Sequence, residues 1–186
     1  MIVLKSSREN IEQYEKAEAV VLFLCKECAD HIRMLGLPED FYEAVAYQIK
    51  TQGYGFTDKG SITSALMKTG SGFTRLIFAG VGAGKECTPN HLRMAAGNAA
   101  RELQKCKIKQ AVAAAPLLTN PKRGHYLKAL AEGLLLGSYT FDKYKSKKDT
   151  DETGSSNRNE EVNTGTPDAI GEKENNIFVT VFNSTT

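Results

Sequence analysis

The sequence predicts an α/β fold in three layers, with a mostly parallel sheet flanked by helices. Two observations carry this prediction. Residues 19–24 and 74–79 are short apolar runs without polar alternation, which is typical of strands buried on both faces. Segments with helical spacing of apolar residues lie between such runs, and strands that alternate with helices form largely parallel sheets. The chain has 186 residues, 41% of them hydrophobic, which is enough for one domain with its own core.

In the N-terminal half, residues 19–24 are the first strand that we expect. Pro38, followed by two acidic residues, predicts a helix start, because acids are favoured at the positive end of the helix dipole. Apolar residues then recur at helical spacing to about Thr51, and glycines end the helix. Residues 60–69, rich in Ser and Thr, are the next expected strand, and the buried strand 74–79 follows.

In the C-terminal half, Thr88 as a cap and Pro89 at the first helical position predict a helix that runs to Cys106. Its apolar stripe is rich in alanine, so it can lie close on a sheet. Residues 110–116 are an expected strand that a proline ends, and residues 124–138 are an expected helix.

Residues 147–175 are mostly polar and charged, and such a composition cannot bury a core. We expect them to form a disordered loop within the domain, before a last strand at 176–182. Residues 146–186 carry four basic and eight acidic side chains, net −4, whereas residues 1–145 are net +6. A mildly basic domain with an acidic tail is not a nucleic-acid binder by charge alone.

The compartment that we expect is the cytoplasm. The sequence has no apolar run near 18 residues, so no transmembrane helix is expected. Residues 1–5 are too short for the apolar core of a signal peptide. The cysteines fit reduced thiols better than a disulfide framework; they are Cys25, Cys28, Cys87 and Cys106.

The turn that contains Gly80, Gly82 and Gly84 is a weak candidate for a ligand site. A phosphate-binding loop requires Gly, four residues, then Gly-Lys-Ser/Thr, but Ala79 and Glu86 stand at two of these positions. The dinucleotide fingerprint G-x-G-x-x-G lacks its third glycine. Glycines at a strand end can still bind an anion at the following helix start. A structural turn is favoured, and a ligand-binding turn remains the alternative.

The pair Cys25 and Cys28 forms a single C-x-x-C motif. A structural zinc site needs four ligands, and the sequence holds no second cysteine pair. A redox dithiol at a strand-to-helix junction fits the context in part. Ordinary thiols are the favoured interpretation, with redox chemistry and zinc as alternatives.

Neither the histidines nor the basic residues indicate catalysis. The histidines are His31, His91 and His125. None of them has an acid or a nucleophile at a spacing that suggests a catalytic triad, so we expect no catalytic residue. A basic run near the end of the second predicted helix is usually a solvated helix end, with nucleic-acid contact as the alternative; it comprises Arg101, Lys105, Lys107 and Lys109.

Two stretches of the sequence resemble the leucyl (cytosol) aminopeptidases. Residues 133–146, GLLLGSYTFDKYKS, resemble the segment that ends the N-terminal domain of that family. Residues 75–82, RLIFAGVG, and 92–101, LRMAAGNAAR, are similar to the family's strand, glycine turn and alanine-rich helix. Together the resemblance covers residues 75–146, and residues 19–70 agree in pattern only.

The resemblance implies a macro-domain-like fold and a place in a two-domain enzyme. Enzymes of this family bind two divalent metals, commonly zinc or manganese, in their C-terminal domain, where the metals activate a water and polarise the peptide carbonyl. The signature of that domain, Asn-Thr-Asp-Ala-Glu-Gly-Arg, is absent from residues 1–186. The resemblance therefore implies a non-catalytic N-terminal domain, with no metal or cofactor site of its own and no peptidase activity alone.

The partners that the resemblance implies are the catalytic domain and a hexamer of the full-length protein. Some family members also bind DNA, so nucleic acid is a less favoured partner. A rival hypothesis is a free-standing macro-like module that binds a nucleotide or ADP-ribose at the turn Gly80–Gly84. The polar stretch 147–175 is longer than the link that is usual in the family.

Overall fold

The computed structural model describes residues 2–7, 14, 16–30, 39–69, 72–114, 123–139 and 177–182. These belong to one compact unit, made of Met1–Tyr139 and Asn175–Thr186. The expected loop at 147–175 lies outside the described residues, so its disorder stays a prediction.

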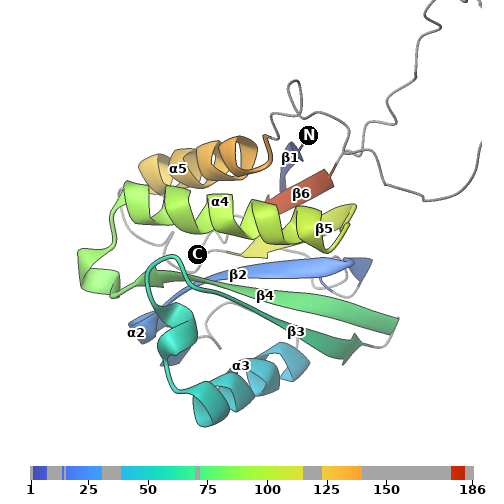
Figure 1. Cartoon of the computed structure of the whole chain (residues 1–186), viewed down its shortest axis with the longest axis vertical. Helices are drawn as coiled ribbons and strands as arrows, with labels where there is room; N and C mark the ends of the chain where they lie inside the picture. The colour runs from blue at the N-terminus through green and yellow to red at the C-terminus, as the bar shows by residue number, and fades with distance from the viewer. Residues whose placement is uncertain are drawn as a thin grey trace, which may run out of the picture. The chain divides into compact units, whose positions relative to one another are not determined.

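The described residues form a six-stranded sheet that is mostly parallel, as the sequence predicts (Figure 1). The strand order is β1-β6-β5-β2-β4-β3. Every neighbouring pair is parallel except β3 and β4, which form an antiparallel hairpin. The strands are β1 (Ile2–Ser7), β2 (Ala19–Cys25), β3 (Ile62–Thr69), β4 (Gly72–Gly82), β5 (Gln110–Ala114) and β6 (Ile177–Phe182).

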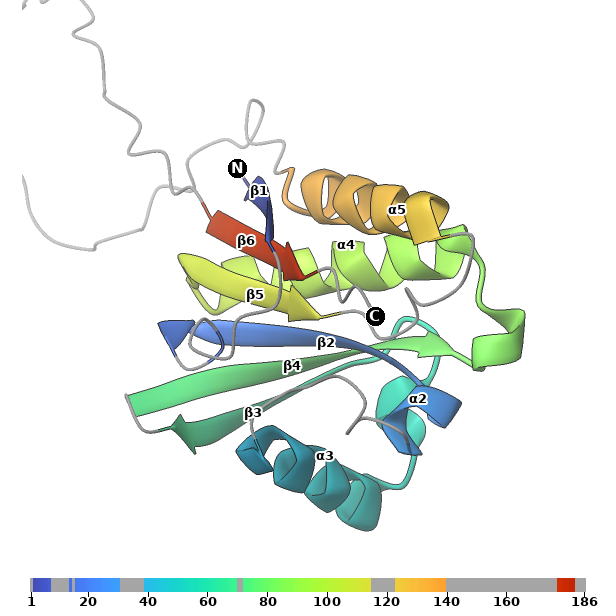
Figure 2. The ribbon, with the colours of Figure 1, turned by 180° about the vertical axis from the view of Figure 1, so that it is seen from behind.

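Helices cover both faces of the sheet and complete the three layers. Helices α4 and α5 pack side by side on one face, and α3 lies on the other (Figures 1 and 2). The helices are α2 (Lys26–Asp30), α3 (Glu39–Gln52), α4 (Pro89–Lys105) and α5 (Arg123–Gly137), with the short 3-10 helices η2 (Gly55–Thr57) and η3 (Gly84–Glu86). The chain therefore has the predicted three-layer α/β fold.

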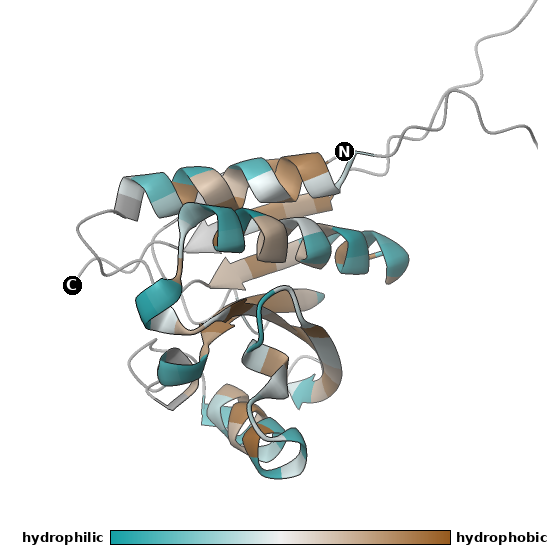
Figure 3. Cartoon of the chain, turned by 60° about the vertical axis from the view of Figure 1, so that its left-hand side comes forward, coloured by the Kyte–Doolittle hydropathy of each residue, from teal (hydrophilic) through white to brown (hydrophobic). Residues whose placement is uncertain are grey.

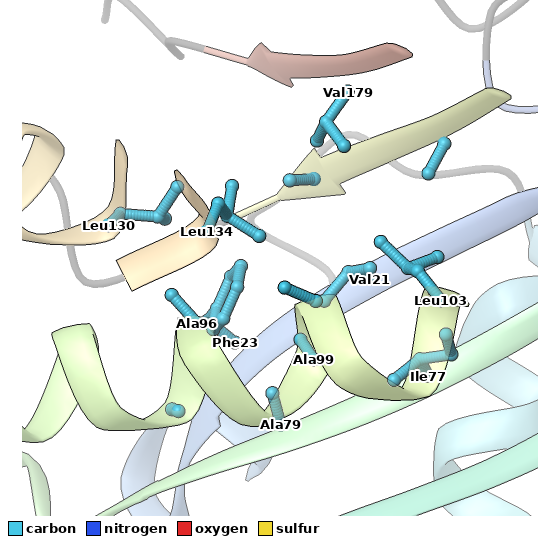
Figure 4. Packing of buried hydrophobic residues seen from close by; sticks show 14 of the residues in the cluster. Val21, Phe23, Ile77, Ala79, Ala96, Ala99, Leu103, Leu130, Leu134 and Val179 are labelled. Carbon is cyan, nitrogen blue, oxygen red and sulfur yellow. The ribbon is translucent and has the colours of Figure 1, made fainter. Parts of the chain in front are cut away.

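Strand β2 lies at the centre of the core. All seven of its residues are buried, because alternate side chains point into two separate clusters. Val21 and Phe23 point toward α4 and α5, where they meet residues such as Ala99 and Leu134 (Figure 4). The intervening side chains pack under α3. Figure 3 shows the same arrangement by hydropathy, with apolar strands inside and hydrophilic segments on the helices.

The start of α4 follows the sequence signals closely. The side chain of Thr88 accepts a hydrogen bond from the His91 N–H at 3.4 Å, and Pro89 occupies the first turn. The cap thus provides a hydrogen-bond partner for one of the backbone N–H groups that the first turn of a helix cannot satisfy within the helix. Helix α4 therefore begins where the sequence predicts it.

Two strands differ from the prediction. β4 extends from Gly72 to Gly82 instead of 74–79, because Gly72 and Phe73 pair with the end of β3 and residues 80–82 continue the pairing with β2. β1 was not predicted, since Ile2–Ser7 combines three apolar residues with a polar end. Its strand character depends on parallel pairing with β6, about 175 residues away in the sequence.

Candidate site at the carboxyl ends of β2 and β4

The position where ligands usually bind in an α/β sheet lies between β2 and β4. The two strands are adjacent and parallel. The chain leaves β2 toward α3 on one face, and it leaves β4 toward α4 on the opposite face. Ligands bind preferentially outside the carboxyl ends of strands at such a reversal. The residues there come from the end of β2, helix α2 and the glycine turn at 80–84.

Gly80 has a structural reason for being glycine. A Cβ on this residue would overlap the carbonyl oxygen of Asp58. The close approach lets the Gly60 N–H donate to the Gly80 carbonyl at 2.9 Å, and the Gly80 N–H donate to the Ser61 carbonyl at 3.0 Å. Gly80 therefore joins β4 to the loop before β3.

Gly82 has a left-handed backbone, with φ +86°. This conformation is disfavoured for residues with a Cβ. Opposite it, the register between β2 and β4 shifts at Leu24 and Cys25. The left-handed residue and the register shift together turn the chain out of β4.

Gly84 meets a carboxylate from the neighbouring loop. Its N–H donates to Oε2 of Glu27 at 2.8 Å. A Cβ on Gly84 would lie 3.1 Å from that oxygen and 3.3 Å from Sγ of Cys25, so glycine leaves room for both. The hydrogen bond from Gly84 is the main cause that lowers the pKa of Glu27 below its usual range. The Glu27 carboxylate thus accepts a hydrogen bond from the Gly84 N–H, which is a donor that an anionic ligand at this turn would use.

Sequence reasoning did not single out Glu27. Its signal is weak, because an acidic residue in the first turn of a helix usually interacts only with its own helix end. The contact to Gly84 joins residues 57 positions apart, and it depends on β2 and β4 being neighbours.

The cysteines differ from the expectation of four reduced thiols. Cys87 and Cys106 are free, and burial raises the pKa of both thiols. Cys25 is disulfide-bonded. The favoured expectation of a reduced thiol is therefore wrong for Cys25, where the C-x-x-C motif had left redox chemistry as an alternative.

The other candidate side chains are not gathered at this site. His91 lies in the first turn of α4, His125 is exposed on α5, and His31 lies outside the described residues. Within the described ranges, no three residues of the types His, Cys, Asp and Glu are placed to hold a metal ion.

The basic residues at the end of α4 are partly paired within the helix. Arg101 donates to Oδ1 of Asn98 at 3.0 Å, and Lys105 lies 3.7 Å from the Glu102 carboxylate.

In the part of the chain that the structure covers, no helix has the length and apolar character needed to cross a membrane.

The fold is that of a macro-domain-like α/β domain. Over 99% of this chain and 100% of the other, it is similar to the macrodomain of Thermus aquaticus DarG, with a TM-score of 0.53 and 11% identity. It is also similar to a tomato leucine aminopeptidase mutant, with a TM-score of 0.61 and 12% identity over 100% of this chain and 33% of that one. At such identities these similarities show the fold alone.

Sequence similarity identifies the family. Residues 37–148 match the model of the cytosol aminopeptidase family, N-terminal domain. A probable cytosol aminopeptidase of Clostridium tetani is 36% identical over 74 residues, which are 40% of this chain and 15% of that protein. One from Clostridium perfringens is 35% identical over 89 residues, 48% of this chain and 18% of that protein. The chain belongs to the cytosol aminopeptidase family and contains its N-terminal domain.

Proposed function

We propose that this chain is the non-catalytic N-terminal domain of a metal-dependent aminopeptidase that removes N-terminal residues from peptides. The observation that supports this most is the match of residues 37–148 to the family's N-terminal domain. The aligned part of the chain spans less than a fifth of the curated relatives that it matches. A match to the N-terminal domain alone accounts for so small a share of the relatives' length.

In this proposal, residues 1–186 form one domain with a disordered polar loop at 147–175. The family's two divalent metals, zinc or manganese, are held by a separate catalytic domain, and the described residues offer no donor cluster for them. The domain acts in assembly, as part of a hexamer, and shapes access to the catalytic domain in the cytoplasm. It has no peptidase activity of its own.

The test of this role is reassembly. The parent's catalytic domain is expressed without residues 1–186, and its mass is measured by light scattering with and without this chain. We expect the chain to co-elute with the catalytic domain in a larger, hexameric species. Separate elution at all protein concentrations would contradict a role in assembly.

A second candidate function is a macro-like module that binds a nucleotide or ADP-ribose. The match to a macrodomain over nearly the whole chain favours it, together with the position of Gly82 at the carboxyl ends of β2 and β4. The Glu27 carboxylate, which accepts the hydrogen bond from Gly84, counts against it. Calorimetry with ADP-ribose distinguishes the two candidates. A micromolar heat that Gly82→Val abolishes, in a variant that still melts cooperatively, would favour the module. Absence of heat in the wild-type protein supports the aminopeptidase domain.

A further inference from the structure

Strand β3 forms one edge of the sheet, and among the described strands it pairs only with β4. In an antiparallel pair, alternate residues of each strand direct their N–H and C=O groups away from the partner strand. The eight residues of β3 therefore include backbone donors and acceptors that point away from β4. Figure 1 shows β3 at this edge. Such an edge can pair with an added strand.

One face of the β3–β4 hairpin carries exposed apolar side chains beside cations. Leu66 is 63% exposed and Phe73 is 68% exposed. The register pairs Leu66 with Arg75 and Lys68 with Phe73, so these four side chains lie on the same face of the sheet. It is the face that α4 covers further along β4, because Ile77 belongs to the core cluster under α4. We call these four residues the hairpin surface.

Arg75 extends from β4 toward the outer edge of the sheet and lies near the end of α4. Its Nη1 donates to Oγ of Ser64 on β3 at 3.5 Å. Burial raises the pKa of the Cys106 thiol, and the charges of Arg75 and Lys105 oppose that rise. Both cations therefore lie near Cys106, at the C-terminal end of α4.

The carboxylates beside these cations already have partners. Glu102 lies 3.7 Å from the Lys105 ammonium, and Glu18 accepts a hydrogen bond from the Lys109 N–H at 2.8 Å. Charge on this side of the sheet therefore favours a partner that brings carboxylates of its own. A second copy of the same surface would add cations, so repulsion between like charges disfavours it.

We propose that the outer edge of β3 binds an extended protein segment in which acidic and apolar residues alternate. The main chain of the segment pairs with β3 and continues the sheet. Its acidic side chains lie on the hairpin surface, where the exposed apolar side chains reduce the access of water to ion pairs with Lys68 and Arg75. Its apolar side chains lie on the other face, beside Ala65 and Met67, which pack against the core cluster under α3.

A single-stranded nucleic acid could also meet the cations and stack on Phe73. It has no peptide main chain, so it cannot continue the sheet or pair with the backbone groups of β3. The free edge therefore favours a protein segment. This inference does not depend on the aminopeptidase assignment, because it concerns one surface of this domain.

The test is fluorescence anisotropy of a fluorescein-labelled peptide, Glu-Val-Glu-Val-Glu-Val-Glu-amide, titrated with the full chain. We expect saturable binding that weakens as the salt concentration rises. Lys68→Glu should weaken the binding about threefold to tenfold, because attraction is replaced by repulsion. Lys128→Glu, the matched charge reversal at an exposed position of α5, should leave the affinity unchanged. Equal affinities of the two variants would overturn the assignment to the hairpin surface.

Main-chain pairing is tested with the same peptide N-methylated at every residue, which keeps its charge but cannot donate main-chain hydrogen bonds. We expect its binding to be lost. Hydrogen exchange of residues 62–69 should become slower with the unmodified peptide. The protein is unchanged in this comparison, so the result does not depend on the folding of a variant. Equal binding of the two peptides would show contact by charge alone and would overturn strand pairing.

Two other outcomes would assign the edge to a different occupant. If a single-stranded oligothymidine binds and the peptide does not, the surface contacts nucleic acid. If light scattering shows a dimer that Lys68→Glu dissociates, and the peptide does not bind, a second copy covers the edge. Either result overturns the proposal, as does the absence of any peptide binding.

Discussion

Two glycines allow α4 and α5 to approach closely. A Cβ on Gly137 would overlap the backbone carbonyl of Gly97, and one on Gly133 would overlap the carbonyl of Arg93. Beside this contact, Arg93 donates to Oε2 of Glu132 at 2.7 Å. The family-like stretch 133–146 thus begins with glycines that the packing of two helices requires.

The first prediction concerns Gly137. Gly137→Ala should lower the free energy of unfolding by about 1–3 kcal/mol, because the methyl group meets backbone atoms that cannot move aside. Urea denaturation measures the effect. Gly124→Ala is the matched control in the first turn of the same helix, where a Cβ meets nothing within 4 Å; it should leave stability unchanged or raise it by up to ~1 kcal/mol. Equal stability of the two variants would contradict the close packing.

The second prediction concerns the pH dependence of the Glu27 contact. Because the hydrogen bond from Gly84 lowers the pKa of Glu27 in the folded state, the contact is complete above the pKa of an unfolded glutamate. It is lost as the pH falls through the lower, folded pKa.

The measurement is an NMR titration of the Gly84 amide. We expect its chemical shift to change with an apparent pKa below the usual glutamate range. Glu27→Gln, the matched control, should abolish that titration. An amide that titrates identically in the variant would show that another carboxylate is responsible.

At the scale of elements, the packing of α4 depends on small residues. Ala95, Ala96 and Ala99 are all fully buried in the core cluster between α4, α5 and the sheet. Figure 4 shows Ala96 and Ala99 there. The alanine-rich stripe predicted this contact from the sequence, because small side chains let a helix lie close on a sheet.

The third prediction therefore concerns Ala99. Ala99→Leu should lower the free energy of unfolding by about 1–3 kcal/mol, since the core has no room for the added volume. This loss of stability should appear as a lower melting temperature. Arg101→Leu, on an exposed position of the same helix, is the control and should change stability by less than about 0.5 kcal/mol. An unchanged melting temperature for Ala99→Leu would mean that this helix face is misassigned.

Elements with strong local signals could be predicted, and those that depend on distant partners could not. β2 was predicted because it is apolar throughout, and α4 because Thr88 and Pro89 mark its start. β1 was missed because its strand character comes from β6, at the other end of the chain. At the candidate site, the three glycines were identified. The Glu27 contact was not, because it joins residues 57 positions apart in the sequence. Redox chemistry at Cys25 was only the less favoured alternative to ordinary thiols, although Cys25 is disulfide-bonded.

At the scale of the whole molecule, the fold and the family agree. The three-layer arrangement is shared with macrodomains and with a leucine aminopeptidase, and the family match covers residues 37–148. A shared fold does not imply a shared activity. The function that we propose therefore depends on the match to the family's N-terminal domain, which we propose to be non-catalytic.

The most direct test of that claim is hydrolysis of leucine p-nitroanilide by this chain alone, with manganese or zinc added. We predict no turnover above the metal-only blank. The full-length parent, assayed in parallel, is expected to be active and confirms that the conditions are suitable. Turnover by the chain that rises with added metal and disappears with a chelator would contradict a non-catalytic N-terminal domain.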